Sequence, residues 1–218
     1  LNEVPDFLYA SSSSVYGNNA RLPYTESDRN LNPNSFYGAT KLSNEILTHS
    51  IIKGSKTRAR GMRFFTVYGP TGRPDMAYFR IINSLINNSN FTLFGDGSIE
   101  RDFTYIDDCV EMIIKLSKEL DTHKNGFSDI VNIGGGHPVS IEKLIEIASK
   151  HLNKKLSLTK ENSNPKDVAI TMADSGYLMS LIGTKPQYKL EDGIEKTINW
   201  AINMVTPAQL EAWVKSST

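Results

Sequence analysis

The amino-acid sequence predicts an α/β fold, made of the C-terminal part of a doubly wound (Rossmann-like) parallel sheet and a small mixed α/β cap. Strand-like and helix-like segments alternate early in the chain, with an apolar run at Pro5–Ala10, a helical pattern over 36–53 and an expected buried strand at Ala59–Thr66. Beyond about residue 70 the elements become shorter and mixed. We therefore predict two parts, residues 1–70 and residues 71–218, with some segments of the second part returning to the sheet.

Particular residues mark where the early elements begin and end. The first strand ends in the small polar residues Ser11–Ser14, and the helix after the Pro33 turn begins at Ser35–Phe36 and ends at Gly54. The apolar positions of this helix could face the core or a partner subunit. They are Leu42, Ile46, Leu47 and Ile51.

In the second part, Asp96-Gly97 stands between the apolar-rich runs Phe91–Phe94 and Arg101–Ile106, which predicts a β-hairpin. Asp107 is expected to N-cap the next helix. The last dozen residues carry no clear signal. The other expected elements are helices at Met76–Asn87, Asp174–Ile182 and Leu190–Asn203 and a strand at Ile130–Ile133.

Tyr37 and Lys41 stand four residues apart, which places a phenol and an ammonium group on one face of a helix. The positive charge favours the phenolate, so Tyr37 is suited to take a proton from a hydroxyl group. An exposed aromatic–lysine pair would show the same spacing. The serine run favours the chemical interpretation, because ligands of open α/β sheets bind beyond the carboxyl ends of the strands.

Gly134–Gly136 follow an expected strand and could form a phosphate-binding loop or a simple turn. The third glycine of the dinucleotide-binding pattern is absent, because Val139 occupies that position, and no acidic residue stands where a ribose ligand is expected. The sequence therefore favours a turn.

The composition excludes several classes of protein. The chain has 24 basic and 24 acidic residues, so its charge favours neither nucleic acid nor an anionic membrane as a partner. No apolar stretch approaches the ~20 residues that span a bilayer, and no signal peptide is visible. The single cysteine, Cys109, is expected in the core, and the four histidines lack metal-ligand spacing. We expect a soluble intracellular protein without a metal.

Four motifs occur in order along the chain, namely Ser-Ser-x-x-Val-Tyr-Gly (Ser11–Gly17), Tyr37-x-x-x-Lys41, Arg63-Phe-Phe-Thr-Val-Tyr-Gly-Pro70 and Arg101-Asp-Phe-Thr-Tyr-Ile-Asp-Asp108. In these motifs, from Phe7 to about Trp200, the chain resembles the extended short-chain dehydrogenases/reductases that act on nucleotide sugars. Within that family it looks most like the UDP-glucuronate 4-epimerases, because of Gly72-Arg73-Pro74-Asp75-Met76.

The resemblance implies an NAD cofactor, a UDP-sugar substrate, a homodimer, a cytoplasmic location and a role in polysaccharide biosynthesis. Proteins of this family open with a Gly-rich strand–turn–helix that holds the dinucleotide. Nothing of this kind precedes Phe7. We therefore expect roughly 100 residues of βα units upstream.

By resemblance, Ser12, Tyr37 and Lys41 are the catalytic residues, with Tyr37 as acid/base and Lys41 also holding the nicotinamide ribose. Phe64 would lie near the nicotinamide. The expected substrate-binding residues are Ser13, Ser14, Thr66, Arg73 and Arg101.

Arg73 suits a bidentate contact with a C6 carboxylate, although it could also be a surface arginine of a loop. Arg101 would meet the diphosphate or the uridine ribose. Asn164-Pro165-Lys166-Asp167-Val168 departs from the family's Pro-Gly-Asp-Val turn, which puts diphosphate contacts there in doubt.

The implied reaction is 4-epimerisation by transient oxidation at C4. Related dehydratases and decarboxylases carry a carboxylate within the serine motif, where this chain has Ser13 and Ser14. The alternatives are a UDP-glucose or UDP-N-acetylglucosamine 4-epimerase, another nucleotide-sugar enzyme of the family, or a non-catalytic binding module or fragment.

Overall fold

The computed structural model describes residues 4–18, 20–163 and 167–216. The chain forms two compact units. Unit 1 comprises Leu1–Val67, Asp102–Pro138 and Ile170–Gln187, and unit 2 comprises Tyr68–Arg101, Val139–Ala169 and Tyr188–Thr218. The chain therefore leaves unit 1 after Val67 and returns to it twice.

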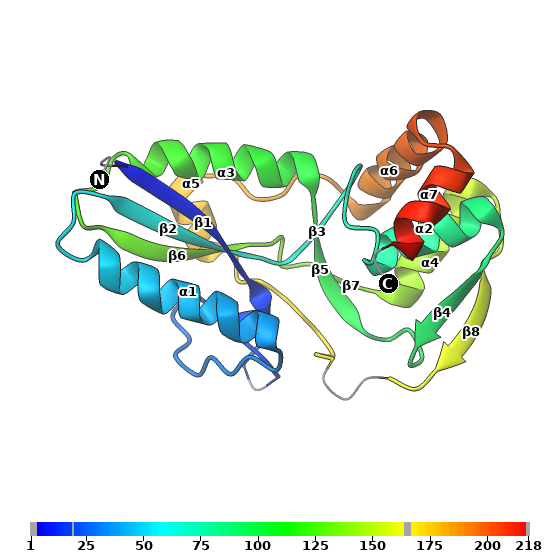
Figure 1. Ribbon diagram of the computed structural model, residues 1–218, viewed down its shortest axis with the longest axis horizontal. Helices are drawn as coiled ribbons and strands as arrows, with labels where there is room; N and C mark the ends of the chain where they lie inside the picture. The colour runs from blue at the N-terminus through cyan, green and yellow to red at the C-terminus, as the bar shows by residue number, and fades with distance from the viewer. Residues whose placement is uncertain (1–3, 19, 164–166, 217–218) are drawn as a thin grey trace. The chain divides into compact units, whose positions relative to one another are not determined.

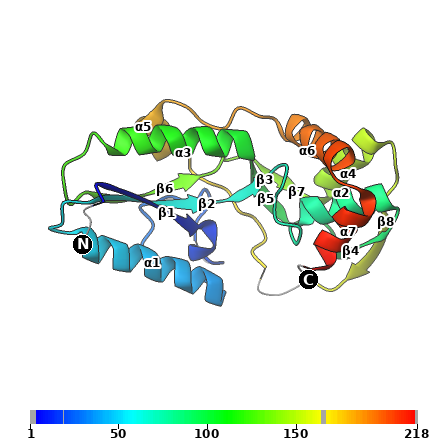
Figure 2. The ribbon, with the colours of Figure 1, turned by 45° about the horizontal axis from the view of Figure 1, so that its top comes forward.

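Unit 1 is built on a parallel three-stranded sheet with the order β1-β2-β6, in which β1 is Asp6–Ser12, β2 is Arg58–Phe64 and β6 is Ser128–Ile133. Helix α1 (Phe36–Ile52) lies on one face of this sheet, and α3 (Ile106–Leu120) and α5 (Gly176–Ile182) lie on the other (Figure 1, Figure 2). The expected α/β fold with parallel strands is confirmed.

The core between this sheet and α3 is apolar. It consists of Met62, Cys109, Met112, Leu116, Val131, Ile133 and Leu178. Cys109 is 3% exposed, which confirms its expected place in the core. A second buried cluster contains Val15, Tyr16, Tyr24, Phe65 and Ala173.

The expected strand at Ala59–Thr66 is two strands in the structure. β2 ends at Phe64, and Thr66–Tyr68 forms β3, which belongs to a separate sheet with the order β3-β5-β7. In this sheet β5 is Glu100–Tyr105 and β7 is Pro138–Ser140. The segment Phe64–Tyr68 contains no glycine or proline that would mark where one strand ends and the next begins.

The predicted hairpin is wrong. β4 (Asn90–Phe94) pairs in parallel with β8 (Ser157–Glu161), and β5 belongs to another sheet. The turn at Gly95–Gly97 is present, but the carbonyl oxygen of Gly97 accepts a hydrogen bond from the backbone N–H of Glu142. That contact with the start of α4 (Ile141–Leu152) leads the chain away from β4.

The prediction that Asp107 is the N-cap of α3 is also wrong. The helix begins at Ile106 with Tyr105 as its N-cap, and Asp107 lies in the first turn. A carboxylate in this position still interacts favourably with the positive end of the helix dipole.

Unit 2 packs α2 (Ala77–Asn87), α4, α6 (Leu190–Met204) and α7 (Pro207–Lys215) beside the β4–β8 pair (Figure 1). Rings of Phe79, Trp200 and Trp213 contact one another within this unit. Helix α7 covers most of the terminal segment that carried no clear signal. A capping box of Thr206 and Gln209, with proline at the first helical position, starts this helix.

Within the described ranges, no helix combines the length and apolar character needed to cross a bilayer. Over the same ranges, no three His, Cys, Asp or Glu side chains are placed to hold a metal ion together.

Candidate active site

The serine run forms a tight turn at the carboxyl end of β1. Ser12 ends the strand, and Ser13–Val15 form a short 3-10 helix. The Ser12 Oγ accepts hydrogen bonds from the backbone N–H of Ser14 at 3.2 Å and from the Ser14 hydroxyl at 2.9 Å. Because ligands of parallel sheets bind beyond the carboxyl ends of strands, these hydroxyls lie where a substrate is expected.

Helix α1 brings Tyr37 to this serine turn. The Ser35 hydroxyl accepts a hydrogen bond from the Gly38 N–H at 3.0 Å and caps the helix. A Cβ atom at Gly38 would lie only 2.8 Å from the carbonyl oxygen of Ser14. The glycine beside Tyr37 therefore allows the first turn of α1 to approach the serine turn closely.

Lys41 lies one turn further along α1, beside Tyr37. Its Nζ is 5.6 Å from the centroid of the Tyr37 ring, and it donates a hydrogen bond to the carbonyl oxygen of Ala10 at 3.1 Å. Ala10 is two residues before Ser12 on β1. The structure thus holds the ammonium group at the serine end of β1, and the Tyr37 side chain remains half exposed and able to meet a ligand.

Phe64 and Ser12 are paired residues of the parallel register, at the ends of β2 and β1. The Phe64 side chain packs against the core of unit 1. Thr66 follows at the start of β3 and is partly exposed. The structure therefore brings Phe64 and Ser12 together, and the cofactor contact of Phe64 stays a prediction.

Arg73, in unit 2, forms a bidentate ion pair with Asp75, from Nε to Oδ1 at 3.1 Å and from Nη2 to Oδ2 at 2.6 Å. The hydrogen bond from Arg73 lowers the pKa of the Asp75 carboxyl. The Arg73 side chain is 71% exposed. A substrate carboxylate at this guanidinium would have to share it with Asp75 or displace Asp75.

Arg101 is tied to the backbone of unit 2. Its Nη1 donates hydrogen bonds to the carbonyl oxygens of Val168 at 2.7 Å and Glu100 at 2.8 Å. The segment that departs from the family turn lies partly outside the described residues, because 164–166 are not described.

Comparison with known proteins identifies the family. Residues 1–134 match the model of the NAD dependent epimerase/dehydratase family. The chain belongs to this family. It is 37% identical over 199 residues to a UDP-glucuronate 4-epimerase of Thermodesulfobacterium geofontis, and the match covers 91% of this chain and 59% of that protein.

Solved structures of family members agree with the fold. A UDP-glucuronic acid 4-epimerase from Bacillus cereus, in complex with UDP-glucuronic acid and NAD, matches with a TM-score of 0.81 and 37% identity, over 89% of this chain and 60% of that one. A UDP-N-acetylglucosamine 4-epimerase from Methanobrevibacter ruminantium matches with a TM-score of 0.82 and 28% identity, over 93% and 64%. The chain thus spans about six tenths of the length of these relatives.

A buried charged network, which the sequence pattern does not reveal, lies next to the serine turn. The Glu45 carboxylate on α1 accepts hydrogen bonds from the Ser11 hydroxyl at 2.5 Å and from Nε and Nη2 of Arg63 at 2.9 and 2.8 Å. The available signal was Arg60 and Arg63 inside the expected buried strand Ala59–Thr66, because a buried cation requires a partner.

The network continues through Tyr16. Its ring stacks under the Arg63 guanidinium at 4.7 Å, and its hydroxyl donates to Oδ1 of Asn132 at 2.8 Å. Burial raises the pKa of Tyr16 to about 12, partly offset by the positive charge of Arg63. The backbone N–H of Asn132 donates to Glu26 at 2.7 Å. Burial raises the pKa of Glu26 as well.

The glycine loop at 134–136 binds a carboxylate of the protein itself. The Asp102 side chain is fully buried and accepts hydrogen bonds from the backbone N–H groups of Gly135, Gly136 and Ala173 at 2.9 to 3.0 Å. Because the N–H groups of Gly135 and Gly136 already bind this carboxylate, the turn interpretation of Gly134–Gly136 is supported over a phosphate loop.

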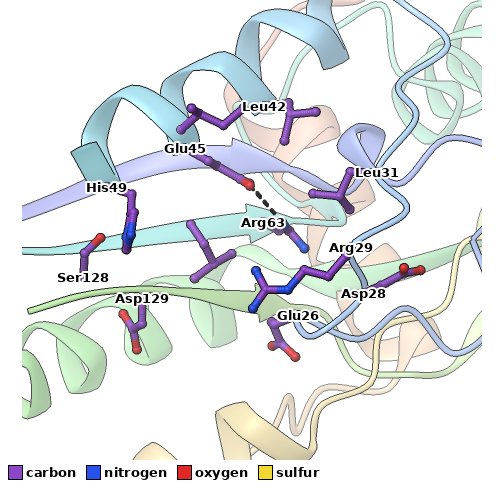
Figure 3. Close-up of a pocket in the computed structure, with 12 residues that line it drawn as sticks. Glu26, Asp28, Arg29, Leu31, Leu42, Glu45, His49, Arg63, Ser128 and Asp129 are labelled. Atoms are coloured by element: carbon purple, nitrogen blue, oxygen red, sulfur yellow. Dashed lines mark hydrogen bonds and ion pairs between the residues drawn. The ribbon is translucent and has the colours of Figure 1, made fainter. Parts of the chain in front are cut away.

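A pocket of about 570 Å³ lies in unit 1, lined by residues of α1, β6 and the 26–31 segment (Figure 3). Leu31, Leu42 and Ile130 form apolar parts of its wall, and the Glu45–Arg63 pair contributes charged groups. None of Ser12, Tyr37 and Lys41 lines it. This pocket is therefore distinct from the candidate active site.

Proposed function

We propose that the complete protein is an NAD-dependent 4-epimerase that interconverts UDP-glucuronate and UDP-galacturonate. The observation that carries this proposal is the placement of Tyr37 and Lys41 against the serine turn, with Lys41 Nζ bound to the strand that ends in Ser12. The family relationship and the UDP-glucuronate 4-epimerases among the relatives support it.

In this proposal Tyr37 accepts the proton of the sugar 4-hydroxyl and later returns it. The ammonium of Lys41 lies beside the Tyr37 ring. The Ser12 hydroxyl binds the 4-hydroxyl and holds it in the orientation for proton transfer, and Ser13 and Ser14 line the same site. Bound NAD would supply the acceptor for the C4 hydride and return the hydride to the opposite face.

The residues of this chain fit the nicotinamide end of the cofactor. The Tyr37 ring is half exposed, and Lys41 Nζ is held at β1 by its hydrogen bond to the carbonyl oxygen of Ala10. Phe64 lies beside Ser12 at the end of the neighbouring strand. We propose that Lys41 holds the nicotinamide ribose and that Phe64 borders the nicotinamide.

For the substrate, we propose that Arg73 binds the C6 carboxylate and that Arg101 contacts the diphosphate or uridine ribose. Charge-assisted hydrogen bonds to a carboxylate contribute roughly 1.5–3 kcal/mol. The existing pair with Asp75 favours a second candidate, a 4-epimerase of UDP-glucose or UDP-N-acetylglucosamine, in which Asp75 keeps Arg73 neutralised.

We also propose that the complete protein is a homodimer that associates through α1. Leu42 packs inward, whereas Ile46, Leu47 and Ile51 are 63%, 58% and 72% exposed. Sedimentation of the wild type and of Leu47→Asp tests this, and a monomeric wild type would contradict it.

Product analysis tests the central proposal. The complete protein, incubated with NAD and UDP-glucuronate, should yield UDP-galacturonate. Formation of UDP-xylose or of a 4-keto-6-deoxy sugar as the main product would contradict epimerisation. UDP-glucose converted faster than UDP-glucuronate would favour the second candidate.

A further inference from the structure

Helix α1 is joined to the sheet by a second polar anchor, Glu45, two turns after Tyr37. Tyr37, Lys41 and Glu45 are spaced by four residues and therefore lie along one side of the helix. Glu45 is only 6% exposed, and its carboxylate oxygens bind Ser11 and Arg63. The helix that carries the catalytic residues is thus attached through a buried carboxylate.

The attachment spans two adjacent strands. Ser11 on β1 and Arg63 on β2 are register partners, so Glu45 binds across the β1–β2 pair at one level of the sheet. Lys41 binds the carbonyl oxygen of Ala10, the residue before Ser11. Two consecutive polar residues on this side of α1 therefore bind two consecutive residues of β1, and the next residue along β1 is Ser12.

A stability role alone explains this anchor poorly. Burying two charges carries a large desolvation cost, and apolar side chains of similar volume often stabilise a core as well or better. The geometry is strict, because the fork of Arg63 binds both oxygens of one carboxylate. Burial would lower the pKa of Arg63, but the hydrogen bonds and charge of Glu45 raise it, so Arg63 stays protonated.

We propose that Glu45 is a positioning residue, which uses Ser11 and Arg63 to fix α1 so that Tyr37 and Lys41 stay in register with Ser12. The inference rests on the proposed epimerase function. Eight residues of helix separate Tyr37 from Glu45, about 12 Å. A small rotation or slide at Glu45 is therefore transmitted to the phenol, and a displacement of about 1 Å in an active site can lower the rate about 100-fold.

The decisive variant is the double substitution Glu45→Leu with Arg63→Met, made in the complete protein. It removes both charges together, so no unpaired ion remains in the core. The expected result is a Tm near that of the wild type, a kcat reduced about 10- to 100-fold and a KM within about threefold. A wild-type kcat in this folded variant would overturn the proposal.

Arg63→Lys is the conservative second variant, because lysine keeps the charge and loses the bidentate geometry. It should fold and show a smaller loss of kcat than the double variant. If the double variant does not fold, this variant decides, and an unchanged kcat overturns the proposal.

Asp6→Asn is the matched control. Asp6 and Arg58 are also register partners on β1 and β2 and form an ion pair, but at the opposite end of the strands from Ser12. The control should keep the wild-type kcat. A loss equal to that of the double variant would mean that any weakening of this strand pair lowers activity, and the proposal would fail.

Hydrogen–deuterium exchange of the NAD-free protein separates this inference from the proposed function. In the double variant, amides in the first two turns of α1 should exchange at least about tenfold faster, while those of α3 stay unchanged. Unchanged exchange in α1 would refute the anchor. An inactive wild type would refute the epimerase function, and the exchange experiment would still decide whether Glu45 holds the helix.

Discussion

The Asp102 carboxylate accepts a hydrogen bond from the backbone N–H of Gly136 at 2.9 Å, inside unit 1. Burial raises the pKa of Asp102, and its bonds to the N–H groups of Ala173, Gly136 and Gly135 offset this only in part. Between about pH 4, where an unfolded aspartate titrates, and the raised folded pKa, the folded state binds more protons. The contribution of Asp102 to the free energy of unfolding therefore falls as pH rises through this window.

Asp102→Asn tests this assignment. An asparagine has one acceptor oxygen in place of two, so a backbone N–H of the 134–136 loop or of Ala173 loses its partner, at a cost of about 1–3 kcal/mol. Urea unfolding at a series of pH values should show a flatter pH dependence in the variant. Parallel pH dependences for the two proteins would contradict a raised pKa.

Tyr37→Phe should abolish most catalysis and leave the fold intact. The Tyr37 ring is half exposed, so loss of its hydroxyl should change Tm little. Loss of a general acid/base typically lowers kcat about 100- to 10,000-fold. Steady-state kinetics and thermal unfolding measure the two effects, and a kcat within threefold of the wild type would contradict the proposed role.

Arg73→Ala should remove most of the preference for UDP-glucuronate over UDP-glucose, a loss of about 10- to 100-fold in the ratio of kcat/KM values. Asp75→Asn is the matched variant, because it removes the charge that competes for the same guanidinium. It should raise the preference for the uronate. If neither substitution changes the ratio, Arg73 does not bind the carboxylate.

Gly17→Ala should be strongly destabilising. Gly17 has φ +70°, and a Cβ atom would lie 1.7 Å from the carbonyl oxygen of Asn32. Gly54 also has a positive φ, of +80°, but nothing lies within 4 Å of its Cβ position. Gly54→Ala should therefore cost about 1–2 kcal/mol, and Gly17→Ala clearly more. Equal losses in thermal unfolding would contradict the close contact at Asn32.

The α/β class and the placement of Tyr37, Lys41 and Ser12 could be predicted because they depend on local patterns. Apolar runs mark buried strands, Ser35 marks the start of α1, and a spacing of four residues marks a helix face. These features require no knowledge of which distant segments meet.

The sheet pairing could not be predicted, because it depends on distant segments. Asp96-Gly97 correctly predicted a turn, but the dipeptide could not show that β4 pairs with a strand more than 60 residues away. Asp102 lies in one of the quoted motifs, yet its role depends on Gly135, Gly136 and Ala173, which only the folded chain brings to it.

The ionic partners of the buried arginines could not be predicted from the sequence either. Arg60 is 0% exposed and pairs with Asp129, its register partner on β6, and with Glu119 of α3. A charged residue in a strand that is predicted to be buried indicates that an ionic partner exists. The identity of that partner depends on strand register, which the sequence pattern does not specify.

In the proposed function, Tyr37 and its neighbours support reversible oxidation at C4 of a UDP-uronate. The most direct test uses UDP-glucuronate carrying deuterium at C4, incubated with the complete protein and NAD. The expected product is UDP-galacturonate that retains the deuterium at C4, with no net accumulation of NADH, because the same hydride is removed and returned. Loss of the label to solvent, or conversion that proceeds unchanged in Tyr37→Phe, would contradict it.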